Sequence, residues 1–342
     1  MRRTVLKTLA LAPAALAFPR IWAQVGKPEK SKLTIAVGGK PALYYLPLTI
    51  TEQLGYFKEE GLQVEIPDFA GGAKALQALV GGSADVVSGA YEHTINMQAK
   101  NQFIQAFVLQ GRVPQIVLGI SNKTMPGYKN IADLKGKKIG VTAPGSSTSI
   151  MASFVLAKAG LKPTDVSFIG VGASSGAISA LKAGQIDAIV NVDPVITMLE
   201  RDKLIKVVFD TRTMKDTLAV YGGPMPAAVL YTHAKFIAEN PNTTQALANA
   251  IVHGLRWMQK AGPSDIVKTV PEAFLLGDRA VYLAAWEHAR EAFSPDGLMP
   301  QAGPATALRT LETFEPELKT KKIDLAKTWT NGFAQRAGVK YP

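Results

Sequence analysis

Short apolar, β-prone runs alternate with helical segments from residue 33 to about residue 209. In the first part of this region, the predicted strands are 33–37, 62–66, 85–88 and 103–109. The predicted helices between them are 46–60, 73–80 and 91–100. This order is typical of a mostly parallel sheet with helices on both faces.

The same alternation starts again after residue 114. Its predicted strands are 115–120, 138–142, 166–171, 186–191 and 204–209. Its predicted helices are 147–159, 175–183 and 194–201. The sequence therefore predicts a second α/β lobe.

The last β-prone run, 227–232, is followed by a mostly helical region. Helices are predicted at 240–260, 279–293, 305–314 and 324–337. Because these helices bring no new strands, they must pack on an existing sheet. We therefore expect lobe one to contain 33–113 and 226–342, and lobe two to contain 114–225.

The chain would cross between these lobes twice, near 112–122 and again near 223–232. Two crossings make a hinge, which suits closure around a ligand.

A weak internal repeat relates residues 71–92 to residues 173–194. Each block reads as a helix with a small-residue start, a glycine stop and a strand. The repeat reflects either a true duplication or the unit that any α/β protein repeats. Matching positions are Ala75 and Ala177, Ala78 and Ala180, Leu79 and Leu181, Gly82 and Gly184, and Asp85 and Asp187.

Residues 1–23 have the layout of a secretory signal. Basic residues that include Arg2 and Arg3 precede an apolar run at 9–18, and Ala23 occupies a plausible cleavage position. The apolar run is shorter than the roughly 20 residues that a membrane span needs. The paired arginines are typical of twin-arginine export, although an ordinary secretory signal remains open.

Composition narrows the function classes. The chain has no cysteine, which excludes disulfides, thiolate catalysis, Cys-ligated metal and a lipoprotein anchor. The net charge is +11, and removal of the four basic residues of the predicted signal leaves +7. These charges are scattered along the chain, so we expect no nucleic-acid partner. The four histidines lack metal-ligand spacing, and no Walker or dinucleotide-binding motif is present, so we expect no metal and no cofactor.

Several short motifs occur in order over roughly residues 33–235. They are YYLPL at 44–48, GYFKEEGL at 55–62, a Gly pair at 71–72, LVGGSAD at 79–85, DLKGKKIGV at 133–141 and LKAGQIDA at 181–188. Together they resemble the periplasmic binding proteins of nitrate, sulfonate and taurine importers, a group that includes binding proteins for thiamine-pyrimidine precursors.

The resemblance implies a type II periplasmic-binding-protein fold, with two doubly wound lobes and a helical C-terminal extension. It also implies a small-molecule ligand and an ABC-type membrane permease with its ATPase as partners. We expect a periplasmic monomer that closes on its ligand.

Two predicted helix starts are candidate ligand contacts. Gly71 and Gly72 precede one helix, and Ser146, Ser147 and Thr148 begin another. Helix N-termini offer free N–H groups and a favourable dipole to an anion. Ser147 and Thr148 can add hydroxyl donors. Simple N-capping is the alternative.

Residues beyond predicted strand ends are also candidates, because ligands of open α/β sheets bind there. Ala90, Tyr91, Asn191 and Asp193 lie at such ends, although Asp193 can instead cap the next helix.

Three further candidates are Tyr44, Arg112 and Gly223. Tyr44 and Tyr91 can stack on a ligand or serve as core or rim residues. Arg112, at the first crossing, can pair with an anionic group or form a hinge salt bridge.

The features favour a transport receptor that binds a small anionic organic solute such as a sulfonate or carboxylate. Glu92 and Asp193 argue for an amine or neutral heterocycle instead, if both face the cleft. An enzyme on the same fold is the main alternative class. The related pyrimidine-precursor synthases carry a cysteine-rich motif, which this chain lacks. A ligand-sensing subunit of a signalling receptor is the third.

Overall fold

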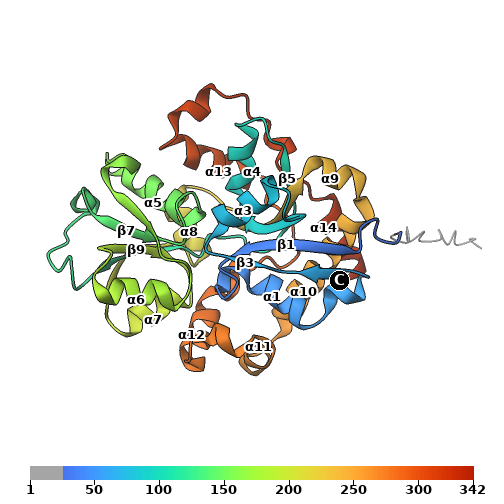
Figure 1. The fold of residues 1–342 in the computed structure, drawn as a ribbon, viewed down its shortest axis with the longest axis horizontal. Helices are drawn as coiled ribbons and strands as arrows, with labels where there is room; N and C mark the ends of the chain where they lie inside the picture. The colour runs from blue at the N-terminus through green and yellow to red at the C-terminus, as the bar shows by residue number, and fades with distance from the viewer. Residues whose placement is uncertain (1–25) are drawn as a thin grey trace, which may run out of the picture.

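Two β-sheets, each covered by helices, organise residues 26–342, which the computed structural model describes (Figure 1). The predicted signal at 1–23 lies outside the described residues. The predicted α/β architecture with two sheets is confirmed.

The first sheet has the strand order β2-β1-β4-β11-β5, and β3 also pairs with β1. The strands β1, β2, β3 and β4 are parallel, whereas β11 is antiparallel to both β4 and β5. The bounds are β1 Lys32–Gly38, β2 Gln63–Glu65, β3 Asp68–Phe69, β4 Val86–Ala90, β5 Ile104–Leu109 and β11 Ala228–His233.

The second sheet has the order β10-β6-β9-β7-β8. The strands β7, β8 and β9 are parallel, and β6 runs antiparallel to its neighbours β9 and β10. The bounds are β6 Val117–Ser121, β7 Lys138–Val141, β8 Ser167–Gly170, β9 Ala188–Asn191 and β10 Ile205–Asp210.

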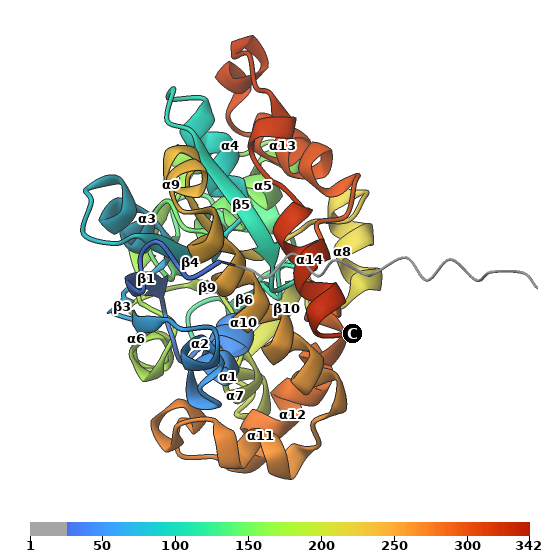
Figure 2. The same cartoon turned by 90° about the vertical axis from the view of Figure 1, so that its right-hand side faces the viewer.

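Helices cover both faces of each sheet (Figures 1 and 2). Alternating residues of each strand contact opposite layers, as a pleated strand requires. The helices from the first part of the chain are α1 Leu46–Gln53, α2 Tyr56–Glu59, α3 Gly72–Val80 and α4 Glu92–Gln98. Those around the second sheet are α5 Ser147–Lys158, α6 Ser175–Ala183, α7 Val195–Arg201 and α8 Met214–Tyr221.

The C-terminal helices pack mainly around the first sheet, but two of them also contact the second lobe. Helix α12 lies against α7, and α13 lies against α5. An ion pair joins Arg201 at the end of α7 to Asp278, which caps α12. The bounds are α9 Ala234–Glu239, α10 Pro241–Lys260, α11 Pro263–Thr269, α12 Arg279–Ala289, α13 Gly303–Glu312 and α14 Gly332–Lys340.

The chain passes between the sheets from β5 to β6 and returns from β10 to β11. Hydrogen bonds join the two crossings at both ends. The N–H of Gln110 donates to the carbonyl of Ala228 at 2.7 Å, and the N–H of Thr211 donates to the carbonyl of Ile116 at 3.0 Å. The two crossings therefore form a paired connection.

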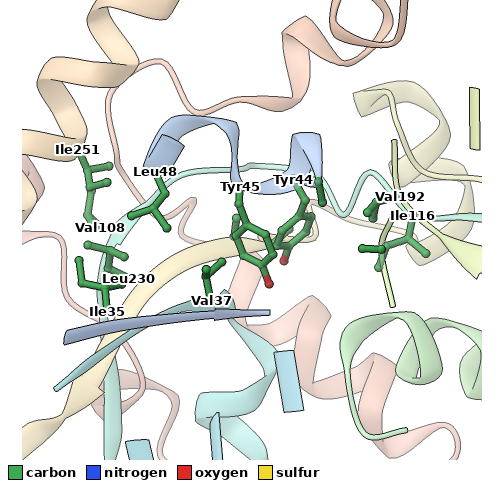
Figure 3. Close-up of a cluster of buried hydrophobic side chains, with 14 of the residues drawn as sticks. Ile35, Val37, Tyr44, Tyr45, Leu48, Val108, Ile116, Val192, Leu230 and Ile251 are labelled. Atoms are coloured by element: carbon green, nitrogen blue, oxygen red, sulfur yellow. The ribbon is translucent and has the colours of Figure 1, made fainter. Parts of the chain in front are cut away.

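One hydrophobic cluster reaches from the first sheet into the second. Figure 3 shows Ile35 and Val37 of β1 on one side, and Ile116 and Val192 of the second lobe on the other, with Tyr44 between them. The inner faces of the two lobes are therefore in direct apolar contact.

The repeat seen in the sequence has a matching structural role in both sheets. The carboxylate of Asp85 accepts from the N–H of Thr34 at 3.1 Å, and that of Asp187 accepts from the N–H of Lys138 at 3.0 Å. Each aspartate thereby fixes the start of the neighbouring strand, β1 or β7. This equivalence does not decide between duplication and a shared α/β unit.

Two predicted elements differ from the observed ones, and three observed helices had no predicted counterpart. The helix predicted at 46–60 is split into α1 and α2, because Gly55 adopts a left-handed φ of 77°. In the predicted helix at 324–337, only the part from Gly332 is α-helical. Helices α8, α9 and α11 were not predicted. The lobe boundaries stay a prediction.

Candidate ligand-binding site

Two adjoining cavities lie between the lobes. Both are lined by Tyr44, Ile116 and Ser147. The other residues lining the first are Gly38, Ala42, Tyr45, Gly72, Thr142, Ser146, Thr148, Ala173 and Val192. The others lining the second are Glu92, Pro114, Ile150, Met151, Tyr221, Met225, Pro226 and Ala227.

Tyr44 lines both cavities from the side of the first lobe. It belongs to a short 3₁₀ turn, Leu43–Tyr45, just before α1, and packs edge-to-face against Tyr45 with ring centroids 4.8 Å apart. Figure 3 shows both rings side by side, with Tyr44 toward Ile116 and Val192. The Tyr44 hydroxyl is buried and lies beside the Ser147 hydroxyl of the opposite lobe. Burial raises its pKa well above the ordinary value, and the nearby Glu92 carboxylate raises it further.

Glu92 brings a buried carboxyl group to the second cavity. It is the first residue of α4, two residues after β4 ends, and only 4% of its surface is exposed. Burial raises the pKa of Glu92, whereas hydrogen bonds from the Ser147 hydroxyl and its own backbone oppose that rise. A buried carboxyl group without a cation favours a ligand that can donate hydrogen bonds or carry positive charge.

The predicted helix starts meet across the cleft. The N–H of Ala73, in the first turn of α3, donates to the Ser146 hydroxyl, which begins α5, at 2.9 Å. A second contact joins the lobes where the N–H of Leu43 donates to the carbonyl of Asp193 at 2.8 Å. The structure is therefore a closed arrangement of the two lobes.

The hydroxyl groups at the start of α5 have different surroundings. The Thr148 hydroxyl accepts from the N–H of Thr142 at 3.0 Å and pairs with the Thr142 hydroxyl, so it links β7 to its own helix. Ser146 is engaged by Ala73. Ser147 lines both cavities, which leaves its hydroxyl the best placed of the three to contact a ligand.

Five of the predicted site residues line the cavities. They are Tyr44, Gly72, Ser146, Ser147 and Thr148. Gly71 lies next to them, at the point where a side chain would meet Ala143 and Ser146 of the opposite lobe.

Tyr91, Arg112 and Asp193 lie outside the lining of both cavities. The Tyr91 hydroxyl bonds that of Thr328 at 2.5 Å. The guanidinium of Arg112 donates to the carbonyl of Glu291 at 2.7 Å and lines a separate open pocket.

The side chain of Asp193 faces away from the cavities. Its carboxylate accepts from the N–H and the hydroxyl of Thr197 in the first turn of α7, although Pro194 and not Asp193 is the N-cap residue of that helix. It also lies 3.5 Å from the buried guanidinium of Arg212.

Ala90, Asn191 and Gly223 do not line the cavities either. The Asn191 amide donates to the carbonyl of Gly172 at 2.9 Å and accepts from the N–H of Val192. Gly223 packs against Thr306, so a side chain there would meet that hydroxyl at 2.5 Å. These positions have structural explanations, and a ligand role for them stays a prediction.

Several lining residues were not singled out from the sequence. Tyr45 and Ala42 stand next to Tyr44, so the motif at 44–48 already indicated this segment. Pro114, Ile116 and Met225 lie on the two crossings. Apolar residues near a hinge carry no distinctive sequence signal, which explains why they were missed.

The side chains of the lining are mostly apolar or hydroxyl-bearing. No Lys, Arg or His side chain lines either cavity. Within residues 26–342, no group of three or more acidic or histidine side chains is placed to hold a metal ion. The described helices include none with the length and apolarity needed to cross a membrane.

Solved structures share this fold. A protein from Bordetella bronchiseptica is 60% identical, with a TM-score of 0.92 over 93% of this chain and 100% of that chain. The alkanesulfonate-binding protein SsuA from Xanthomonas axonopodis pv. citri, bound to MOPS, is 19% identical. Its TM-score is 0.68 over 89% of this chain and 99% of that chain, which shows the same periplasmic-binding-protein fold.

Two kinds of relative are similar to this chain in sequence. A putative binding protein of Brucella abortus is 28% identical over 68% of this chain and 68% of its own length. The 4-amino-5-hydroxymethyl-2-methylpyrimidine phosphate synthase of Schizosaccharomyces pombe is 25% identical over 65% of this chain, and the match spans 64% of that relative's length. The sequence model of the NMT1/THI5 like family matches residues 43–263. The resemblance to binding proteins of this type is thus confirmed, and the chain belongs to the NMT1/THI5-like family.

Proposed function

We propose that this protein is the solute-binding protein of an ABC-type importer and holds one small molecule between its lobes. The observation that carries this proposal is a pair of adjoining cavities whose lining residues come from both lobes. Such cavities form only when the lobes meet, so a ligand bound there stabilises the closed arrangement.

Closure supplies the mechanism of capture. The two hydrogen-bonded crossings act as the hinge, and the contact between Ala73 and Ser146 forms when the lobes come together. The closed form presents a surface that the permease recognises. Export to the periplasm would follow from the predicted signal at 1–23, and we expect the receptor to act as a monomer.

The lining of the cavities bears on the charge of the solute. The anionic ligand predicted from the sequence relied on Arg112 and on two free helix starts. Arg112 lies outside the cavities, and the helix starts are hydrogen-bonded to one another. The anionic solute stays a prediction that the lining does not favour.

A second candidate function is an enzyme of the pyrimidine-synthase type, which the fungal relative supports. The resemblance implies a cysteine-rich motif for such synthases, and this chain contains no cysteine. A receptor is therefore the better supported of the two.

The test is a thermal-shift screen of small nutrients, followed by scattering with any compound that binds. A ligand present at 100 times its Kd should add about 2.7 kcal/mol of stability. It should also lower the radius of gyration of the ligand-free protein. Chemical conversion of the bound compound would favour the enzyme. Scattering curves that are identical with and without saturating ligand would contradict the closure mechanism.

A further inference from the structure

Among the described residues that line the two cavities, Glu92 of the second cavity is the single carboxyl group, and none is a basic side chain. We propose, on the basis of the proposed function, that the ligand carries a positively charged nitrogen and that the carboxylate of Glu92 is its counter-ion. The ligand class is thus a small organic amine or quaternary ammonium compound.

The carboxyl group has no cation of its own. Among the described residues, no ion pair involves Glu92. The buried Arg212, the nearest comparable case, is engaged by three acidic residues of the second lobe: Asp193, Glu200 and Asp210. A buried carboxylate without a partner costs free energy that a bound cation would offset.

The walls around Glu92 are suited to a cation. Tyr44 and Tyr221 line the same cavity, together with the polarisable side chains of Met151 and Met225. Tyrosine rings attract cations through their negative faces, and they do so more strongly when water is excluded. Burial raises the pKa values of Tyr44 and Tyr221, and the nearby charge of Glu92 raises both further.

A structural role of Glu92 at the start of α4 does not explain why its carboxyl group is buried. An acidic residue in the first turn of a helix interacts favourably with the helix dipole, and Glu92 begins α4. An exposed carboxylate would provide that benefit without the cost of burial. Ser147 of the opposite lobe is the hydroxyl beside this carboxyl group, so closure brings Glu92 and a wall of the second lobe to the same ligand.

Protons should take part in binding. Burial raises the pKa of Glu92, so a fraction of the ligand-free protein carries a proton there as pH falls toward that pKa. A cationic ligand binds the ionised form, so binding releases protons and affinity increases as pH rises through the titration of Glu92.

The experiment uses compounds of matched shape and different charge. The probes are butylamine, butanol and butyrate; benzylamine, benzyl alcohol and benzoate; and choline with 3,3-dimethylbutanol. Each is tested by thermal shift and calorimetry on the wild-type protein, on Glu92→Gln and on Glu315→Gln. Glu315 is a matched control, because burial also raises its pKa but it lies in another pocket.

We expect at least one amine to bind the wild-type and Glu315→Gln proteins and to lose tenfold or more affinity in Glu92→Gln. Calorimetry in buffers of different ionisation enthalpy should show proton release by the wild type, which needs no variant. The inference is overturned if no amine binds, or if amine affinity is unchanged in Glu92→Gln. Closure around a carboxylate or a neutral probe would overturn the inference and leave the receptor function standing. Failure of every compound to close the lobes, in this panel and in the nutrient screen, would count against both.

Discussion

Substitution of Gly71 by alanine should hold the lobes apart without damaging either one. Gly71 caps α3 with φ −178° and ψ 168°, an extended conformation that any residue adopts. An added Cβ would lie 2.8 Å from the Cβ of Ala143, 3.0 Å from its backbone nitrogen and 3.0 Å from the Ser146 hydroxyl. All of these atoms belong to the opposite lobe, so the methyl group is tolerated only when the cleft is open.

The magnitude follows from the rigidity of the neighbours. Two of the three close contacts involve Ala143, whose backbone joins β7 to α5 and cannot rotate away. Overpacking of this kind costs about 1–3 kcal/mol. If closure is required for tight binding, this cost should weaken ligand affinity about 5- to 150-fold, since each 1.4 kcal/mol corresponds to a factor of ten.

Calorimetry and small-angle scattering on Gly71→Ala measure the two effects. We expect weaker binding and a radius of gyration that decreases less when ligand is added. Gly127→Ala is the matched control, because Gly127 is exposed in the second lobe and an added Cβ there meets nothing within 4 Å. Wild-type affinity and full compaction in Gly71→Ala would refute the account of closure.

Three further predictions concern stability. Burial lowers the pKa of His93 from 6.5 to about 4, so the unfolded chain takes up a proton that the folded protein resists. The free energy of unfolding should therefore fall by about 3 kcal/mol between pH 6.5 and pH 4. Urea unfolding should show that His93→Gln removes most of this fall, whereas the control His288→Gln, at an exposed position, keeps it. Arg212→Met leaves buried Asp193 without its cation and should destabilise by about 3–5 kcal/mol in urea, and a loss below about 1 kcal/mol would contradict the importance of this network. Burial raises the pKa of Glu92, so the folded carboxyl group costs stability as pH rises above 4.5, and Glu92→Gln should stabilise the ligand-free protein more at pH 8 than at pH 4. An equal difference at both pH values would contradict that cost.

Most strands and helices of the fold could be predicted from local sequence patterns. The alternation of apolar runs and glycine stops predicted both sheets and both crossings, because strand and helix periodicity depends on neighbouring residues. Both helix starts, at Gly71–Gly72 and Ser146–Thr148, were also recognised as candidate contacts from the sequence. Helix α8 was missed because its only buried residue is Thr217, which leaves no apolar stripe to recognise.

The site itself depended on contacts that the sequence does not encode locally. The position of Arg112 at the first crossing suggested that it contacts the ligand. Its guanidinium instead donates a hydrogen bond to the carbonyl of Glu291, 179 residues away in the sequence. Glu92 first counted only against an anionic ligand. The structure adds that Tyr221, from a helix that was not predicted, lines the same cavity as Glu92.

The position of β11 constrains the order in which the molecule can fold. This strand lies between β4 and β5, and its Ala228 pairs with Ala90, so the first sheet receives a central strand only after the whole second sheet has been synthesised. Such distant pairing slows folding, since a long loop must close before the contact forms. Until then β4 and β5 are two open edges, which readily pair with other chains. A nascent chain that ends before residue 228 is therefore the form most exposed to aggregation. In that form a chaperone would cover the unpaired edges of β4 and β5.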